Sequence, residues 1–589
     1  MTTDATLSAL DDRLGNRAST VARRVLVALI LLVALGGLLV PIVSVLLESR
    51  SVPVFRAYVD QLTDPVFLGA LARSLVYSAV VMAVTLAIGF PTAYMLTLCG
   101  RRVFAVLLIV FAVPQVTSLL VRTYSWIAVL GVDGPAVTLL NGLGIEADSL
   151  VGTDVGVALV LIHYYLPYVI LTSYASMRTI RPEQMRAAQS LGASRIEAFW
   201  TVYAPQALPG VIAGGLFVFV ITAAMYAVPS LIGGTGKQTV AMLVVQQSVT
   251  GFATDSAAPA AQTVILTLVV LPIVALGIKL VGAQQFLGLG GRSTAVARKP
   301  RPLRVSPLRA VLARFPQTPP RLHLTALLMT GLALVLTVLP FGYLFLISFQ
   351  PLPLLQVPRE KFATTWYERV LADRDWLDVA LSSVEVALLA TAIAVALGWF
   401  LASRTVRAAP RQAGILMALA TLPLVMPAIT IGQGYFGVFA DLDLLGSWWA
   451  IAFVHAVVIL PYVYINVLSG MSSYDSRYDN AAASLGASRS RTMWKVRMPI
   501  LRQFVVTGAF LAFLVSFDEF TITRFLTGLS FETLPVKFYG AAAQNLSPEL
   551  AAVGSLVVGA ILLLIVLFGL FLLRTRARSA KPKESHDLH

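Results

Sequence analysis

Six residues, Ser-Leu-Gly-Ala-Ser-Arg, occur twice in this chain, at Ser190–Arg195 and at Ser484–Arg489. Each copy is preceded at the same distance by a Pro-Tyr pair, Pro167-Tyr168 and Pro461-Tyr462. A fixed interval held over such a stretch indicates an internal duplication. The chain is therefore predicted to consist of two related halves in tandem. The most closely repeated part is a loop, which is typical of a segment that contacts another molecule.

Composition places both halves in a membrane. The chain has 589 residues, of which 58% are hydrophobic and 12% charged, whereas soluble domains carry about 25% charged residues. A membrane helix needs about 20 apolar residues. We predict an all-α polytopic membrane protein with about twelve spans, six in each half. The candidate spans are Val25–Leu47, Leu71–Leu98, Val103–Leu130, Val155–Met177, Leu208–Ile232 and Thr263–Phe286, then Leu324–Ser348, Val379–Ala402, Ala413–Phe439, Trp448–Gly470, Phe504–Thr527 and Leu550–Leu573.

The spans define five regions. We expect a cytoplasmic N-terminus over 1–24, a first transmembrane domain over 25–286 and a basic cytoplasmic linker over 287–323. A second transmembrane domain over 324–573 and a cytoplasmic tail over 574–589 follow. Because each half has an even number of spans, the halves are expected to lie parallel, related by a pseudo-two-fold axis along the membrane normal.

Charge gives the orientation. Between Leu287 and Leu322 there are eight Arg or Lys residues and no acid, and other basic loops fall on the same predicted side. Basic loops mark the cytoplasmic face and contact anionic lipid headgroups, so both termini are predicted to be cytoplasmic. The net charge of +15 does not indicate nucleic-acid binding, because no aromatic-basic module accompanies it.

The repeated loop has local signals of its own. Gly192 is a natural left-handed helix terminator, and Ser194 with Glu197 forms a capping box that would start a second short helix. The second copy keeps Ser488 but has Arg491 in place of the acid, so its cap is expected from the hydroxyl alone. Each copy is thus predicted to be a helix–turn–helix at the cytoplasmic surface. An interfacial elbow without a partner is the plain alternative, which the repetition disfavours.

The loop resembles that of permease subunits of ABC importers, which has the form E-A-A-x-x-x-G. The resemblance implies a coupling helix that docks on a cytoplasmic ATPase, with two ATPase copies for two loops. It also implies a periplasmic or lipid-anchored solute-binding protein and a place in the bacterial inner membrane. The leading acid is replaced in both copies here. The matching residues are Arg186, Ala187, Ala188, Gly192 and Ala193, and Asn480, Ala481, Ala482, Gly486 and Ala487.

Further motifs resemble the two permeases of spermidine/putrescine importers. The stretch Ser118–Trp126 is similar to the first permease, and Ser516–Phe520, Thr533–Lys537 and Ser547–Glu549 are similar to the second. The resemblance implies two polyamine permeases fused in one chain. ABC permeases for other small solutes, such as phosphonate or ferric iron, share much of this pattern. A secondary transporter built from parallel repeats remains a further alternative, although it does not need the paired loops.

Nothing in the sequence indicates an enzyme or a cofactor site. The run Gly233–Thr239 fails as a phosphate-binding loop because Leu231 stands where a glycine is needed. The single cysteine, Cys99, and five scattered histidines have no metal-ligand spacing. We therefore expect no catalytic residue, metal or cofactor in this chain, with ATP and Mg²⁺ bound by a separate ATPase.

Two carboxylates, Asp518 and Glu519, fall inside the eleventh predicted span. A charge at the bilayer centre costs about 3 kcal/mol, so it needs a partner or a wet cavity. The pair is interpreted either as a station for the ammonium groups of a polyamine or as a structural pair, for example with Arg524 or Arg122, or as protonated in place. The other candidates for the substrate pathway are Glu385 and three aromatic residues whose rings could face a cation, Tyr124, Trp126 and Tyr226.

Overall fold

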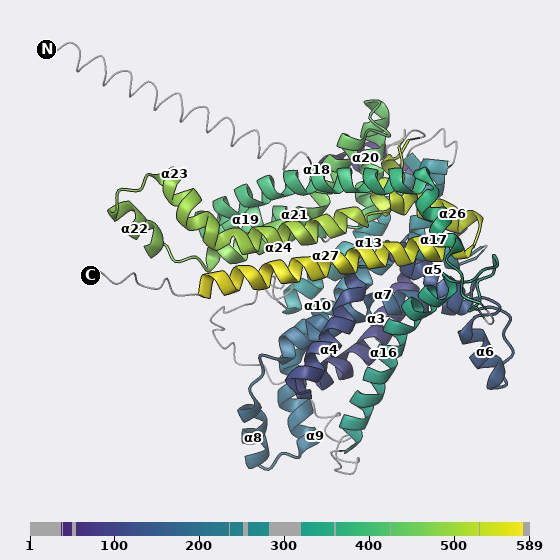
Figure 1. The fold of residues 1–589 in the computed structure, drawn as a ribbon, viewed down its shortest axis with the longest axis horizontal. Coiled ribbons are helices and arrows are strands. Elements are labelled where there is room, and N and C mark those ends of the chain that lie inside the picture. The colour runs from purple at the N-terminus through teal and green to yellow at the C-terminus, as the bar shows by residue number, and fades with distance from the viewer. Residues whose placement is uncertain are drawn as a thin grey trace.

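The computed structural model describes residues 37, 39–49, 55–234, 236–250, 257–281, 320–358, 361–424, 426–528 and 531–580. Every regular element in these ranges is a helix, which confirms the predicted all-α class (Figure 1). Ten of the described helices are long and apolar enough to cross a membrane, and a bent pair makes eleven. Several predictions lie outside the described residues: the N-terminus 1–24, more than half of the first predicted span (25–36 and 38), the end of the sixth (282–286), most of the linker 287–323 and the last nine residues of the tail.

The two halves repeat the same order of helices. In the first half the helices that have a counterpart are α3, α4, α5, α7, α10 and α13, and in the second half they are α18, α19, α20, α21, α24 and α27. Their bounds are Pro65–Leu98, Arg101–Ala112, Leu119–Leu130, Asp154–Met177, Ala204–Ala223 and Ala257–Val281, then Arg374–Thr405, Pro410–Thr421, Ala428–Asp441, Trp448–Ser472, Met498–Phe517 and Pro548–Ala580.

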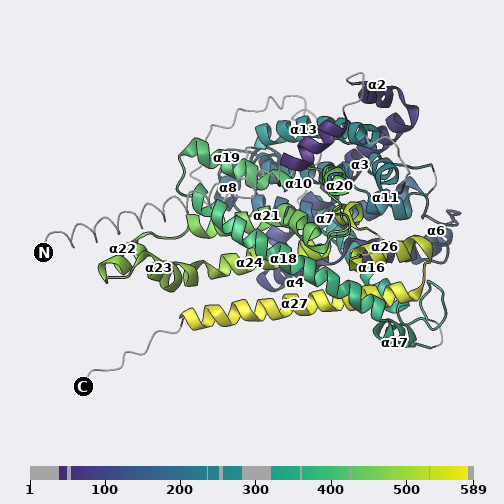
Figure 2. The same ribbon diagram turned by 90° about the horizontal axis from the view of Figure 1, so that it is seen from above.

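Shorter helices connect these spans. On one end of the bundle lie α6 (Pro135–Gly142), α17 (Thr365–Ala372) and α26 (Leu534–Gln544) (Figures 1 and 2). The other short helices are α2 (Arg56–Thr63), α11 (Ala227–Ile232), α12 (Val240–Val245) and α25 (Thr521–Leu526). Polar caps set several helix starts. Asp64 accepts a hydrogen bond from the backbone N–H of Val66 ahead of α3, and Thr153 accepts one from Gly156 ahead of α7.

The first helix of each half packs against the other half. Helix α16 (Pro320–Ile347) opens the second half and runs along α3 of the first. It also reaches α7, where Nδ1 of His163 lies 2.7 Å from the carbonyl of Leu336. The apolar helix Leu39–Glu48 of the first half meets α20, and the Tyr435 hydroxyl donates a hydrogen bond to the carbonyl of Gly37. The halves are thus interlocked rather than merely adjacent.

Four predicted spans are not continuous helices. The span Val103–Leu130 is broken by a 3₁₀ turn at Val113–Val116, and Ala413–Phe439 is bent by 89° between Leu424 and Ala428. Pro114 in the first break and Pro423 in the second lack the N–H that would continue the helix. Such breaks are tolerated at membrane depth where neighbouring groups satisfy the freed backbone.

The other two breaks are equivalent in the repeat. Helix α10 ends at Ala223 and α11 begins at Ala227, while α24 ends at Phe517 and α25 begins at Thr521. The eleventh predicted span, Phe504–Thr527, is therefore not one continuous helix, and Asp518 and Glu519 lie in its break. In the second half, Glu519 accepts hydrogen bonds from the N–H groups of Ile522 and Thr523, which stabilises a new helix start at α25 after the break. The first-half break has Ala224 and Met225 at the equivalent positions, so a carboxylate is not required for it.

Candidate functional site

The repeated loops form two short helix pairs, α8 (Pro182–Ser190) with α9 (Arg195–Ala198), and α22 (Arg477–Ser484) with α23 (Arg489–Thr492). Both pairs project from the end of the bundle opposite to α6, α17 and α26 (Figure 1). The backbone turns at Gly192, with φ +92°, and at Gly486, with φ +75°. The predicted glycine terminators are confirmed, because both residues adopt the left-handed conformation that ends a helix.

The second helix of each pair starts at the predicted serine. The Ser194 Oγ accepts a hydrogen bond from the Glu197 N–H at 3.1 Å, and Ser488 Oγ accepts one from the Arg491 N–H at 3.3 Å. Both hydroxyl caps are therefore confirmed. The turn itself is closed by the N–H of Ala193, which donates to the carbonyl of Ala188 at 3.1 Å.

The loop tips present an exposed surface. Leu191 and Leu485 are equivalent in the repeat, and their side chains are 89% and 88% exposed, the highest values among the exposed large hydrophobic residues of the described chain. Arg186 and Asn480, which stand at the acidic position of the family pattern, are also exposed. In the described part of the chain neither side chain forms a hydrogen bond or an ion pair. Each loop thus exposes an apolar tip, Leu191 or Leu485, next to an exposed polar side chain, Arg186 or Asn480. The remaining loop residues are exposed at Ala187 and Ala481, partly covered at Ala193 and Ala487, and least exposed at Ala482.

The residues on which each loop rests, called here the base of the loop, differ between the two halves. Under α8, Tyr203 is buried in an apolar cluster on which Ile180 and Met185 pack. Under α22, the three equivalent positions are polar: Tyr474, Asp479 and Arg497.

These three polar residues form one network. The Tyr474 hydroxyl donates to Asp479 at 2.7 Å, Arg497 pairs with the same carboxylate, and the guanidinium lies 5.3 Å from the Tyr474 ring centroid. Burial opposes ionisation of Asp479, but the hydrogen bonds from Tyr474 and Arg497 outweigh it and lower its pKa. The α22 base is therefore held by charge where the α8 base is held by apolar packing.

Asp518 joins the two halves. Its carboxylate accepts a hydrogen bond from the backbone N–H of Leu119 at 3.1 Å, at the start of α5 in the first half. In the same turn, Arg122 donates from Nε to the Ser118 carbonyl at 3.4 Å, and its guanidinium lies 4.0 Å from the Tyr164 ring centroid. Arg122 is only 1% exposed. A carboxylate at a helix N-terminus beside a buried cation is electrostatically stable at this depth.

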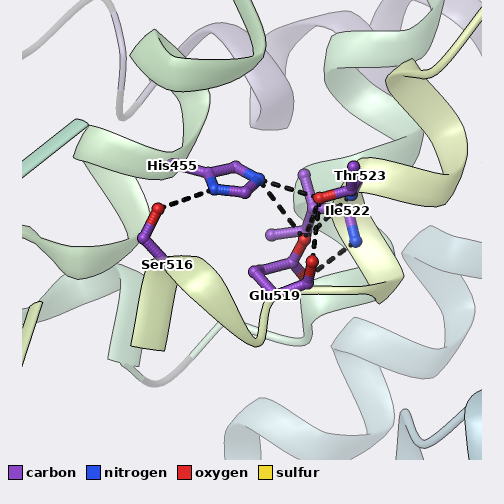
Figure 3. A network of polar contacts seen from close by, with 5 residues as sticks. All are labelled: His455, Ser516, Glu519, Ile522 and Thr523. Atoms are coloured by element: carbon purple, nitrogen blue, oxygen red, sulfur yellow. Dashed lines mark hydrogen bonds and ion pairs between the residues drawn. The ribbon is translucent and has the colours of Figure 1, made fainter. Parts of the chain in front are cut away.

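Glu519 is bound within its own half. Its two oxygens accept hydrogen bonds from the N–H groups of Ile522 and Thr523, each at 2.9 Å, so the side chain caps α25 (Figure 3). The Thr523 hydroxyl also donates to Glu519 at 2.8 Å. His455 lies between α24 and α25, with its ring nitrogens 2.9 Å from the Ser516 hydroxyl and 2.8 Å from that of Thr523. The two predicted carboxylates thus have different environments.

Three aromatic side chains meet around Phe520, the residue that follows the two carboxylates in the chain. The rings of Tyr226 and Phe520 stack with centroids 5.9 Å apart and an interplanar angle of 15°. Tyr539, from α26, contacts both rings, and its hydroxyl lies 2.9 Å from that of Tyr226. Because Tyr226 and Phe520 occupy the equivalent breaks of the two halves, this cluster lies at the junction of the halves.

The remaining pathway candidates lie elsewhere. The Tyr124 hydroxyl donates to the carbonyl of Ser547, and the ring packs on Phe538. Trp126 is 2% exposed and packs against His163 of α7. Glu385 is exposed on the face of α18 that carries the exposed Leu381 and Leu388. The structure therefore brings Tyr226 to Phe520, the residue that follows Asp518 and Glu519 in the chain, but it places Trp126 in helix packing and Glu385 on the outer face.

Sequence reasoning missed several members of the site. His455 and Tyr539 carry no local motif, and their roles depend on contacts between helices far apart in the chain. Phe520 could have been found, because the internal repeat places it opposite Tyr226. The hydrogen bond between Asp518 and the Leu119 N–H of the first half has no signal in the sequence.

Comparison with known proteins follows the two halves. A model of the family described as "binding-protein-dependent transport system inner membrane component" matches this chain twice, over residues 66–285 and 394–579. These two matches confirm the predicted duplication and the predicted resemblance to importer permeases.

Individual relatives each match about a third of the chain. The spermidine/putrescine transport system permease protein PotC of Haemophilus influenzae is 27% identical over 206 residues, which cover 35% of this chain and 80% of PotC. PotB of the same organism, also a spermidine/putrescine transport system permease protein, is 31% identical over 212 residues, 35% of this chain and 74% of PotB. The putrescine transport system permease protein PotI of Escherichia coli K12 is 27% identical over 211 residues, 34% of this chain and 74% of PotI. The chain belongs to the family of inner-membrane components of binding-protein-dependent transport systems, and it carries that family's domain twice.

Proposed function

We propose that this chain is the permease of an ATP-driven polyamine importer, with two permease units fused in one polypeptide. The observation that carries the proposal is the pair of equivalent exposed loops, each with a left-handed glycine turn, at one end of a duplicated membrane bundle. The similarity to permeases named for spermidine and putrescine supports the solute class. The protein is a multi-pass transport subunit rather than an enzyme.

The two loops are proposed to bind two copies of a cytoplasmic ATPase, one copy to each. Leu191 and Leu485 would enter apolar pockets of the two ATPase copies, because a large, fully exposed apolar side chain gains most from burial at an interface. ATP and Mg²⁺ would be bound by the ATPase, and this chain would hold no cofactor. A periplasmic or lipid-anchored solute-binding protein would deliver the polyamine to the opposite end.

This arrangement implies an orientation in the bacterial inner membrane. The loop end carries the basic residues Arg181, Arg186, Arg195 and Arg477, so it is proposed to be cytoplasmic. Both termini would lie on that side, and the basic linker would contact anionic lipids there.

The route of the polyamine is proposed to run through the junction of the halves. Asp518 would exchange its contact with the α5 start for an ammonium group, because charge-assisted hydrogen bonds compensate for the water that the cation loses. Tyr226 and Phe520 would form the constriction beside it, where ring faces attract cations.

Reconstitution with the ATPase and the solute-binding protein tests this proposal. The purified complex should contain one permease chain and two ATPase copies by native mass spectrometry. ATP hydrolysis should rise when the binding protein is loaded with putrescine or spermidine, and it should not rise with phosphonate or ferric iron. Stimulation by phosphonate or iron alone would assign the chain to another solute, and a complex without ATPase would overturn the importer mechanism.

A further inference from the structure

Two adjoining hollows lie at the end of the bundle opposite to the paired loops. The larger, of about 500 Å³, is lined by Ile127, Val151 and Ser230–Leu231 of the first half and by 542–546 of the second. The smaller, of about 210 Å³, is lined by Trp376, Ala541, Ser547, Glu549 and Leu550. Gln544 and Asn545 line both, so the hollows meet at the loop between α26 and α27.

The larger hollow borders the elements that hold the aromatic cluster. It is lined by Ser230 of α11, which begins just after Tyr226, and by Ala542 of α26, which lies one turn beyond Tyr539. A solute in these hollows would therefore be next to the constriction of the two halves, on its outer side.

In the smaller hollow, one carboxylate oxygen of Glu549 is held by a hydrogen bond and the other has no partner among the described residues. Its Oε1 accepts a hydrogen bond from the Trp376 indole N–H at 3.1 Å. Among the described residues, no hydrogen bond or ion pair reaches Oε2. Glu549 is half-buried, while Gln544 and Asn545 beside it are exposed. A fixed carboxylate oxygen next to neutral amide oxygens matches the three donors of a primary ammonium group.

The ammonium group of Lys537 lies against Trp376, which lines the same wall of the smaller hollow. Nζ of Lys537 lies 4.9 Å from the Trp376 ring centroid, at the distance of a cation–π contact. The lysine's charge is met by Asp375, 3.8 Å away, whose side chain is 81% exposed, and not by Glu549. The Trp376 ring thus already accepts an alkylammonium, and the neighbouring carboxylate has no cation of its own.

We propose that these hollows form an outer binding site for a linear polyamine, in which Glu549 pairs with one terminal ammonium and the Gln544–Asn545 amides hold the rest of the chain. The site rests on the proposed function, since it names where the solute first meets the permease after release from the binding protein. Trp376 positions the Glu549 carboxylate through its indole N–H. From here the solute would pass to the Tyr226–Phe520 constriction and then to Asp518.

Glu549→Gln tests the site, because an amide oxygen can keep the bond to Trp376 while the charge is lost. Asp375→Asn is the matched control, since it removes one negative charge from the same wall outside the hollow. Binding of radiolabelled spermidine to the purified chain in nanodiscs should weaken about tenfold in Glu549→Gln and less than about twofold in Asp375→Asn. Thermal stability of Glu549→Gln should equal that of wild type.

Two results would overturn the site. Spermidine affinity unchanged in Glu549→Gln, with wild-type uptake in the full complex, would remove Glu549 from the route while leaving the polyamine importer intact. If Glu549→Gln and Asp375→Asn lost spermidine affinity equally, the loss would come from the general surface charge and not from a site at Glu549. By contrast, a wild-type complex that neither binds nor accumulates any polyamine would contradict the proposed function itself. If Glu549→Gln is unstable, Glu549→Asp, which keeps the charge, separates the cases: it should bind spermidine more tightly than Glu549→Gln, and equal weakness would count against the site.

Discussion

Tyr226 and Phe520 occupy equivalent positions in the two halves, and their rings stack on each other with centroids 5.9 Å apart. The two positions are separated by the same interval as Gly192 and Gly486. Each residue directly precedes the short helix that follows a break, α11 in one half and α25 in the other. The pseudo-two-fold axis therefore passes between these rings, and a solute moving along the axis meets them.

Phe520→Ala should loosen this constriction. An aromatic pair contributes about 1 kcal/mol beyond burial, which is about fivefold in an equilibrium between closed and open states. We expect ATP-independent leak of spermidine from loaded liposomes to rise by about this factor. Tyr226→Phe is the matched control, because it keeps the stacked ring and removes only the hydroxyl that meets Tyr539. Equal leak in Phe520→Ala and wild type would show that the stack does not close the route.

The two adjacent carboxylates should respond differently to neutralisation. Asp518→Asn retains an oxygen that can accept from the Leu119 N–H, so the fold should hold while spermidine flux falls. Glu519→Gln leaves one α25 N–H without its acceptor, which costs about 1–3 kcal/mol, so thermal stability should fall. Size-exclusion profiles after heating and uptake by the reconstituted complex measure both effects. A stable Asp518→Asn protein with unchanged flux would remove Asp518 from the route.

Gly192 and Gly486 should tolerate asparagine but not valine. Open space surrounds both positions, so a side chain meets no clash and the cost is backbone strain alone. A left-handed conformation costs a β-branched residue about 1–2 kcal/mol, whereas Asn adopts it readily. Gly192→Val and Gly486→Val should therefore uncouple ATP hydrolysis from transport, while the Asn variants remain coupled. The ratio of solute transported to ATP hydrolysed is the measurement, and wild-type ratios in both valine variants would refute a role of these turns in coupling.

The α22 base should be more sensitive to acid than the α8 base. The pKa of Asp479 is lowered in the folded state, so its contribution to stability is present above the unfolded value of 3.8 and is lost as the pH falls through the lower folded value. Hydrogen exchange should show α22 opening below about pH 3.8 before α8, whose base is apolar.

The triple variant Tyr474→Ile/Asp479→Met/Arg497→Tyr copies the first-half residues into the second half. It should abolish the difference in acid sensitivity, with α22 then behaving as α8 does. Equal acid sensitivity of the two loops in the wild type would contradict the assignment of a charged base to α22.

The repeat and the loops could be predicted because their signals are local. Gly192, Ser194 and Ser488 each determine the conformation of a few neighbouring residues, and the structure has them as expected. The breaks could not be placed from prolines alone. Pro114 lies in a break, but Pro167 and Pro461 lie inside continuous helices, because whether a freed carbonyl finds a partner depends on the tertiary surroundings.

The environment of the carboxylates also depends on long-range packing. The sequence shows that Asp518 and Glu519 are unusual at their depth, but not that one reaches Leu119 in the other half while the other caps α25. The same holds for the exchange of the first helices, which brings Gly37 to Tyr435. The contacts of Asp518 with Leu119 and of Tyr435 with Gly37 join residues 399 and 398 positions apart, beyond any periodicity or motif, whereas the Glu519 cap is local.

Uptake of radiolabelled spermidine into liposomes tests the central claim most directly. Liposomes containing the chain, its ATPase and the solute-binding protein should accumulate spermidine against its gradient only when ATP and Mg²⁺ are present on the ATPase side. The chain alone, given a proton or sodium gradient, should accumulate none. Accumulation by the chain alone under an ion gradient would contradict the ATP-driven importer and assign the protein to secondary transport.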